Sequence, residues 1–190
     1  MGAIFAFAIF VLYAIAYLDA RCIKMRYVDQ SEIDIILSMV GRKAMINYRN
    51  YCILVMMISY GMKIVDFINL KVEDIDWNTG IMSLRRKERV YRAVTLTEED
   101  LSMLRGLLAL YQGFGGSTWL FRGYNGNKLT NHIMIKMMKT ISRKTGVQLT
   151  TKDINATYIA RKVESEGMEK VARELGYCSA EYLKRFFELE

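Results

Sequence analysis

The amino-acid sequence predicts a mainly helical fold with a small antiparallel β-sheet, and three observations lead to this prediction. Apolar residues recur at helical spacing through most of the 190 residues. The period changes over residues 72–97, where two alternating segments around a basic turn predict antiparallel strands. Hydrophobic residues make up 52% of the chain, which excludes a disordered protein and suffices for one well-buried domain.

The charge balance indicates a polyanionic partner. The formal net charge of +7 favours nucleic acid or an anionic membrane surface, and a solvated basic surface is the alternative. Cys22, Cys52 and Cys178 form no Cys-x-x-Cys pair and no disulfide framework, so three free thiols suit a reducing compartment. His132 is the single histidine of the sequence and has no partner at metal-ligand spacing, so neither a metal site nor a cofactor is expected.

Residues 1–18 form an uncharged apolar run. As a helix they would be about 27 Å long, near the thickness of a bilayer core. Arg21, Lys24 and Arg26 follow directly, and they would hold the rest of the chain in the cytoplasm. Three interpretations stay open: a membrane helix, a helix buried in a core or a dimer interface, and a signal peptide. The protein is therefore expected to be cytoplasmic, or membrane-anchored with its main domain in the cytoplasm.

Residues 19–46 are predicted to be connecting helices ahead of a larger domain at residues 47–190. An apolar stripe in this segment ends at Gly41 and is typical of a helix face buried in a core. The stripe consists of Ile33, Ile36, Leu37 and Val40.

The other helices follow from periodicity and from glycines that break it. Residues 50–70 are predicted to form an apolar helix, a turn at Gly61 and a second, amphipathic helix. A helix is expected over residues 98–111, where acidic residues suit its positive N-terminus. A basic helix is expected over residues 130–145. Two glycines divide residues 149–187 into three helices.

The order of these segments resembles the catalytic domain of the tyrosine recombinases, or phage integrases. The resemblance runs from Asn47 to Phe187. Residues 60–63, Tyr-Gly-Met-Lys, stand where the family has Thr-Gly-Leu-Arg, and residues 152–155, Lys-Asp-Ile-Asn, stand where it has His/Lys-x-x-Arg. Residues 175–177, Leu-Gly-Tyr, stand where it has Leu-Gly-His. The resemblance implies the fold of that catalytic domain.

The resemblance also assigns catalytic positions. The family's reaction uses a tyrosine nucleophile, two arginines on the phosphate, and a lysine in a β-turn that protonates the leaving 5′ oxygen. Lys87, counted back from the end of the second strand, matches the usual residue at its position. The family-equivalent positions in this chain are Lys63, Lys87, Lys152, Asn155, Tyr177 and Phe186.

The replacements at these positions predict that DNA strand cleavage has been lost. Phe186 has no oxygen for nucleophilic attack. Asn155 is neutral where the second arginine belongs, and one such donor is typically worth about 3–4 kcal/mol in the transition state. Lys63 keeps the charge of the first arginine but not its two-pronged grip on a phosphate. Tyr182, one helical turn before Phe186, is the alternative nucleophile.

The expected function is that of an integrase-like DNA-binding protein that regulates or assists an active recombinase. The alternatives are an active, non-standard tyrosine recombinase that carries out DNA integration with Tyr182, and a membrane-anchored interaction protein that keeps only the fold. The expected partner is double-stranded DNA, with an active homologue, self-association or a membrane at residues 1–18 as further candidates. The predicted DNA-binding residues are Arg85, Arg86, Lys87, Arg89, Arg92, Lys136, Lys139, Arg143, Lys144 and Lys152.

Overall fold

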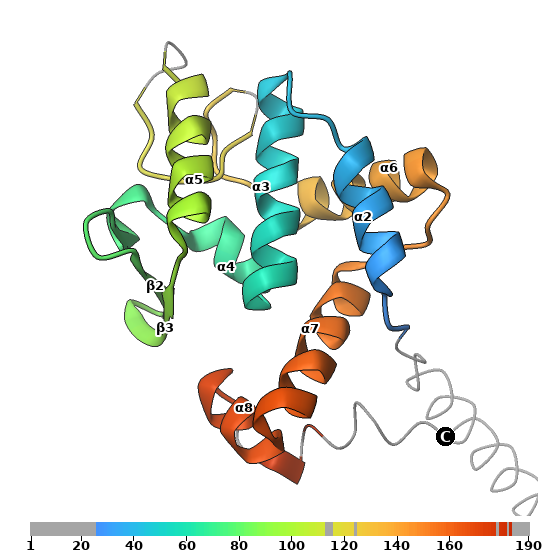
Figure 1. Ribbon diagram of the computed structural model, residues 1–190. Coiled ribbons are helices and arrows are strands. Elements are labelled where there is room, and N and C mark those ends of the chain that lie inside the picture. Colours follow the sequence, from blue (N-terminus) through green and yellow to red (C-terminus); the bar gives the residue numbers. More distant parts are fainter. Residues whose placement is uncertain (1–25, 113–115, 124, 178, 182, 184–190) are drawn as a thin grey trace, which may run out of the picture.

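A computed structural model describes residues 26–112, 116–123, 125–177, 179–181 and 183 (Figure 1). It confirms a mainly helical fold with one three-stranded antiparallel sheet. The elements are α2 (Gln30–Met39), α3 (Met45–Tyr60), α4 (Ile64–Asn69), the 3₁₀-helix η1 (Val72–Asp74), β1 (Ile75–Asp76), β2 (Ile81–Arg86), β3 (Arg89–Thr95), α5 (Glu98–Leu110), α6 (Asn131–Thr145), α7 (Thr151–Glu166) and α8 (Met168–Glu174).

The predicted helix over residues 1–18 lies outside the described residues. Within the described part of the chain, no helix is both long enough and apolar enough to cross a membrane.

Helix α3 is the centre of the main core. It contacts α2, α5 and α7, and Figure 1 shows it between α5 and α2. Its residues Ile53 and Leu54 are fully buried, and Ile33 and Ile36 of α2 pack into the same core. The stripe predicted before Gly41 is therefore a core face. The boundary predicted between residues 46 and 47 stays a prediction.

Local sequence signals place the helix ends. The Thr130 hydroxyl caps α6 by accepting a hydrogen bond from the backbone N–H of Ile133 at 3.3 Å. Thr150 and Asp153 form a capping box that begins α7. Gly146 ends α6 with φ of +73°, a left-handed conformation that glycine adopts without steric cost.

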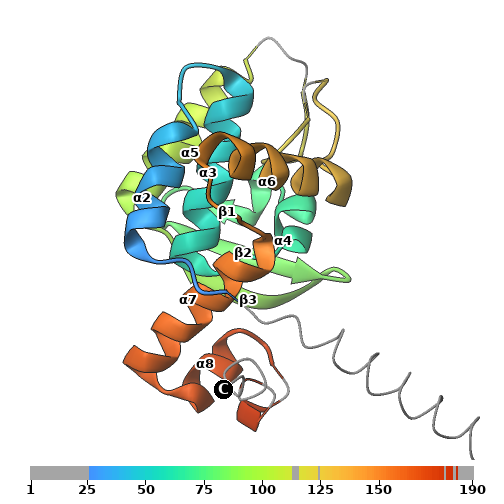
Figure 2. The ribbon, with the colours of Figure 1, turned by 90° about the vertical axis from the view of Figure 1, so that its right-hand side faces the viewer.

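The sheet lies beside α4. Strand β2 pairs with β1 on one side and with β3 on the other, and Met82 lies opposite Val94 with both side chains buried. A two-residue turn of Lys87 and Glu88 joins β2 to β3, and both residues have positive φ, as such hairpin turns require. Helix α4 contacts both β2 and α6, and Figure 2 shows α4, α6 and the hairpin tip on one side of the molecule.

A second, smaller core lies where α7 continues into α8. It is separate from the main core, and α7 joins the two because Ile154 packs in the main core whereas Ile159 packs in the smaller one. Figure 1 shows α8 set apart from the main body of helices. The other buried residues of the smaller core are Val171, Ala172, Leu175 and Leu183.

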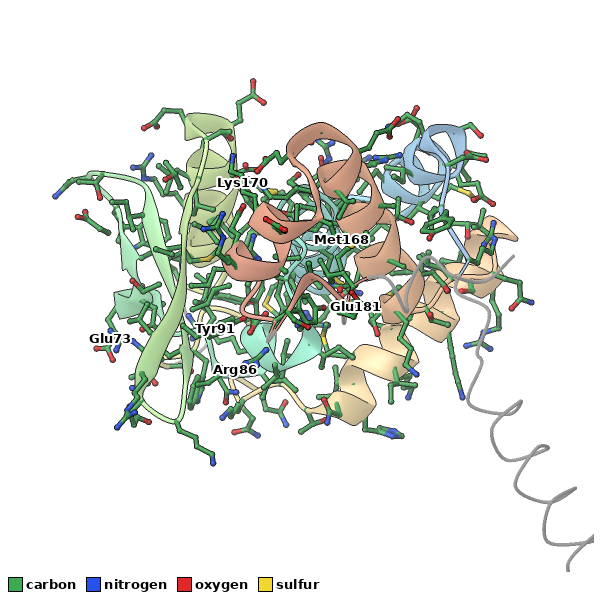
Figure 3. All side chains as sticks on the ribbon, turned by 90° about the horizontal axis from the view of Figure 1, so that it is seen from below. Glu73, Arg86, Tyr91, Met168, Lys170 and Glu181 are labelled. Carbon is green, nitrogen blue, oxygen red and sulfur yellow. The ribbon has the colours of Figure 1, made fainter. Side chains whose placement is uncertain are left out.

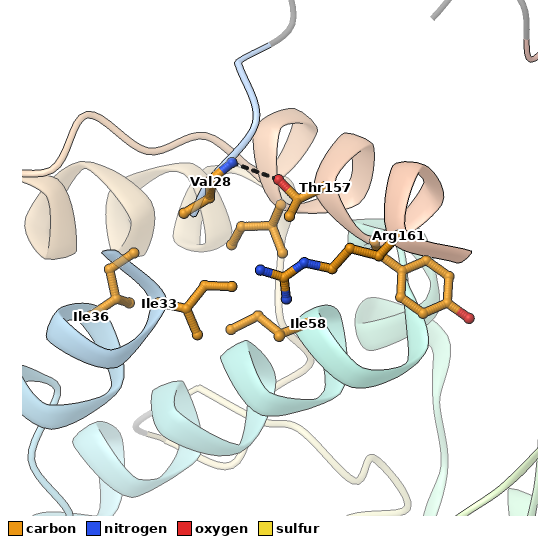
Figure 4. Close-up of a pocket in the computed structure, with 8 residues that line it drawn as sticks. Val28, Ile33, Ile36, Ile58, Thr157 and Arg161 are labelled. Atoms are coloured by element: carbon orange, nitrogen blue, oxygen red, sulfur yellow. Dashed lines mark hydrogen bonds between the residues drawn. The ribbon is translucent and has the colours of Figure 1, made fainter. Parts of the chain in front are cut away.

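The segment before α2 crosses α7. The backbone N–H of Val28 donates a 2.7 Å hydrogen bond to the Thr157 hydroxyl (Figure 4). Half of the residues that line a pocket next to this bond are isoleucines, among them Ile33 and Ile58, and the Arg161 side chain also lines it. Its lining is too apolar for a phosphate site.

Candidate nucleic-acid interface

The junction between α3 and α4 presents the first predicted site residue, Lys63. Gly61 ends α3 with φ of +60°, and Lys63 is the N-terminal cap residue of α4. The Asp66 carboxylate accepts a 2.7 Å hydrogen bond from the backbone N–H of Lys63. A buried aspartate in the first turn of α4 therefore fixes the backbone that carries the Lys63 side chain.

Two further predicted site residues, Asn155 and Tyr177, meet this junction. The Asn155 amide donates a 3.0 Å hydrogen bond to the backbone carbonyl of Gly61. The Lys63 ammonium lies 4.3 Å from the centroid of the Tyr177 ring, at cation–π distance. The structure thus brings Lys63, Asn155 and Tyr177 together from α4, α7 and the turn after α8.

The Lys63 ammonium lies in a half-buried, positively charged environment. Burial lowers the pKa of Lys63 most, and the charges of Arg86 and Arg92 lower it further, while Asp66 opposes them. Burial disfavours the charged form, and two nearby cations add repulsion. An anion bound here would relieve both effects.

The β2–β3 hairpin carries five of the predicted DNA-binding residues, and four of them are exposed. Lys87 lies in the turn and is exposed, as is Arg89 at the start of β3. Arg86 lies over the ring of Tyr91, with its guanidinium carbon 4.3 Å from the ring centroid. Arg85 forms a 2.7 Å ion pair with the buried carboxylate of Asp74, so part of its charge is neutralised within the protein.

Arg92 does not belong to this exposed set, and that it binds DNA stays a prediction. Only 7% of the residue is exposed. Its guanidinium donates hydrogen bonds to the backbone carbonyl of Tyr60 at 2.7 Å and to the Tyr158 hydroxyl at 3.2 Å, and it lies 3.6 Å from a Glu174 carboxylate oxygen. Arg92 therefore ties β3 to α3, α7 and α8, because its position on β3 faces these helices.

Helix α6 carries the second group of predicted DNA-binding residues, on the far side of α4 from the hairpin. All four are exposed, as is Lys152 in the first turn of α7. The four residues are Lys136, Lys139, Arg143 and Lys144. We call the exposed hairpin cations, Lys63 and these four residues together the basic surface; Lys144, at its edge, also lines a pocket with Asn47 and Asn50 near the start of α3.

The two predicted nucleophile positions, Tyr182 and Phe186, lie outside the described residues. His132 is exposed near the start of α6. Among the residues that the structure describes, no three His, Cys, Asp or Glu side chains are grouped in a way that could hold a metal ion.

The family model for phage integrases matches residues 26–184, most of the chain. The chain belongs to the phage integrase family. A comparison with curated proteins finds no match.

Solved structures of recombinases share the fold. XerA recombinase superposes with a TM-score of 0.73 at 20% identity, over 87% of this chain and 61% of that one. XerH site-specific recombinase bound to its difH substrate superposes with a TM-score of 0.73 at 18% identity, over 86% of this chain and 50% of that one. The Tn1549 transposon integrase in complex with circular intermediate DNA superposes with a TM-score of 0.71 at 14% identity, over 84% of this chain and 60% of that one. This chain therefore spans about half to three-fifths of the length of these recombinases.

Two residues of the site in this phage integrase family member were not predicted from the sequence. Asp66 and Tyr91 are joined by a 2.7 Å hydrogen bond from the Tyr91 hydroxyl to the Asp66 carboxylate. Asp66 lies three residues after Lys63, the spacing of a helix cap, and this signal could have identified it. Tyr91 gives no such signal, because an aromatic residue in a strand is usually a packing residue.

Proposed function

We propose that this member of the phage integrase family binds double-stranded DNA through its basic surface and does not cleave it. The single observation that carries the proposal is the half-buried Lys63 at the start of α4, a helix that contacts both strand β2 of the cationic hairpin and the cationic helix α6. Cations spaced over neighbouring elements suit a phosphate backbone, because neutralising several phosphates releases counterions. The DNA complexes of XerH and of the Tn1549 integrase, which share the fold, support this choice of ligand.

The proposed loss of cleavage rests on the residues at the family-equivalent positions. Lys63 and Asn155 stand where the family has arginines, and the Asn155 amide is occupied by the Gly61 carbonyl. An amide that donates to the backbone holds the turn but offers no charge to a phosphate in the transition state. The proposed role is to regulate or assist an active recombinase.

DNA binding is tested by fluorescence anisotropy of a labelled duplex over a range of salt concentrations. Neutralising Arg85, Arg86, Lys87 and Arg89 together to glutamine should weaken binding. It should also reduce the slope of log Kobs against log salt by about 3, since each lost phosphate contact contributes about 0.9 and Arg85 is partly neutralised by Asp74. The charge-matched control neutralises four basic residues on other elements: Arg42, Lys43, Arg105 and Lys170. An equal effect in both variants would contradict the proposed surface.

Loss of cleavage is tested with a nicked duplex that traps covalent intermediates. A cleaving recombinase would leave a protein–DNA adduct that survives denaturation, and we expect none. An adduct would contradict this part of the proposal. If Tyr182→Phe then abolished it, Tyr182 would be the nucleophile.

A further inference from the structure

The side chain of Arg86 is held in place on the hairpin by Tyr91. The two lie side by side in Figure 3, with the Arg86 guanidinium carbon 4.3 Å from the ring centroid. The ring itself is fixed from two directions. Its hydroxyl donates a 2.7 Å hydrogen bond to Asp66, and the ring lies beside Gly176, where an added Cβ would be in ordinary van der Waals contact with it at 3.5 Å.

Asp66 joins this pair to Lys63. One carboxylate oxygen accepts from the Tyr91 hydroxyl, and the other accepts from the backbone N–H of Lys63 at 2.7 Å. A buried carboxylate thus connects the two cation-bearing elements, α4 and the hairpin. Arg86 is also close enough to Lys63 for its charge to lower the pKa of the Lys63 ammonium, after the larger effect of burial. Asp66 and Tyr91 thus connect the backbone of Lys63 to the side chain of Arg86, and the two cations lie within electrostatic range of each other.

Lys87, the neighbouring cation, lies in a different situation. It occupies the first position of the hairpin turn with φ of +46° and is exposed. Among the described residues it has no hydrogen-bond or ion-pair partner that would fix its side chain. Immobilising a free lysine on binding costs rotamer entropy, whereas a stacked arginine has lost part of this freedom in advance.

We propose that Lys63 and Arg86 form a two-cation clamp for one phosphodiester group of the bound DNA, with Tyr91 as the residue that positions Arg86. The clamp rests on the proposed DNA-binding function and specifies where a phosphate is held. The guanidinium can grip two phosphate oxygens with its planar fork, and the ammonium supplies a point charge beside it. The Tyr177 ring covers one side of that ammonium, so the phosphate approaches from the side of Arg86. Lys87 contacts a phosphate without a preorganised side chain, so it adds less to the affinity than Arg86.

The test compares single charge removals on one hairpin in the full chain. Arg86→Gln should weaken binding of a labelled duplex about tenfold or more and reduce the salt slope by about 0.9, as expected for a charge-assisted phosphate contact. Lys87→Gln and Arg89→Gln remove the same charge from exposed neighbours, and each should change affinity less than about threefold. Thermal unfolding of each variant establishes that it folds.

The positioning role of Tyr91 is tested by a double-mutant cycle. Tyr91→Leu removes the ring under Arg86 and should weaken DNA binding, but it should have little further effect once Arg86→Gln is present. Tyr91→Phe keeps the ring but loses the hydrogen bond to Asp66, so it should weaken binding less than Tyr91→Leu does. It covers the case in which Tyr91→Leu does not fold.

The outcomes separate the clamp from the proposed function. An unchanged protein that shows no salt-dependent binding would overturn both. The clamp alone would be overturned if the protein without substitutions binds DNA but Lys87→Gln weakens binding as much as Arg86→Gln does. The positioning role would be overturned if Tyr91→Leu and Arg86→Gln weaken DNA binding additively. It would also be overturned if Tyr91→Phe weakens DNA binding as much as Arg86→Gln does.

Discussion

Gly61 allows α7 to lie directly against the turn that presents Lys63. A Cβ at this position would lie 2.1 Å from Cδ1 and 2.4 Å from Cε1 of the Tyr158 ring, and the backbone φ is +60°. For Gly61→Ala, the left-handed backbone costs about 1–2 kcal/mol. Displacing a packed ring costs about 1–3 kcal/mol. The free energy of unfolding should therefore fall by about 2–5 kcal/mol in total.

Urea unfolding followed by circular dichroism measures this loss. Gly146→Ala is the matched control, because Gly146 has φ of +73° but no heavy atom within 4 Å of the added Cβ. It should cost only the backbone part, about 1–2 kcal/mol. In a Tyr158→Ala background the ring is absent, and the cost of Gly61→Ala should fall to the same value. Equal losses for Gly61→Ala and Gly146→Ala in the natural background would refute the close-packing argument.

Two further predictions concern buried groups. Arg92→Met removes the contacts with Tyr60, Tyr158 and Glu174, and it should lower the free energy of unfolding by about 3 kcal/mol. Urea unfolding measures this change, and a loss below about 1 kcal/mol would show that these contacts contribute little. Burial raises the pKa of Cys52 from its ordinary value of 9.0 to about 12. Since the folded pKa is the higher one, this stabilisation is complete below pH 9 and is lost as the pH rises toward 12. Cys52→Ala should therefore show a flatter loss of stability over that range in pH-dependent unfolding, and an unchanged slope would contradict it.

Several features of this protein were predictable because their causes are local. The stripe at Ile33 and Ile36 repeats at helical spacing, so one face of α2 had to be buried whatever packed on it. Gly61 ended a helix, and Lys87 lay in a turn flanked by alternating residues. The order of these elements already resembled the phage integrase catalytic domain, and the family match over residues 26–184 confirms this.

The candidate site was predictable only in part, because its contacts join residues that are far apart in the sequence. Lys63 and Tyr177 were predicted site residues, but no local pattern says that the ring of one covers the ammonium of the other. The link from Asp66 to Tyr91 likewise exists only because α4 packs on β2 beside β3.

Arg89 and Arg92 show what the sequence could not distinguish. Both are arginines of the same strand, and the sequence predicted both to bind DNA. The structure leaves Arg89 exposed and buries Arg92 against Tyr158 and Glu174. The helices, the hairpin and the surplus of positive charge were predictable because they depend on residue spacing and composition. Which cations face solvent was not predictable, because burial depends on which elements pack over a strand.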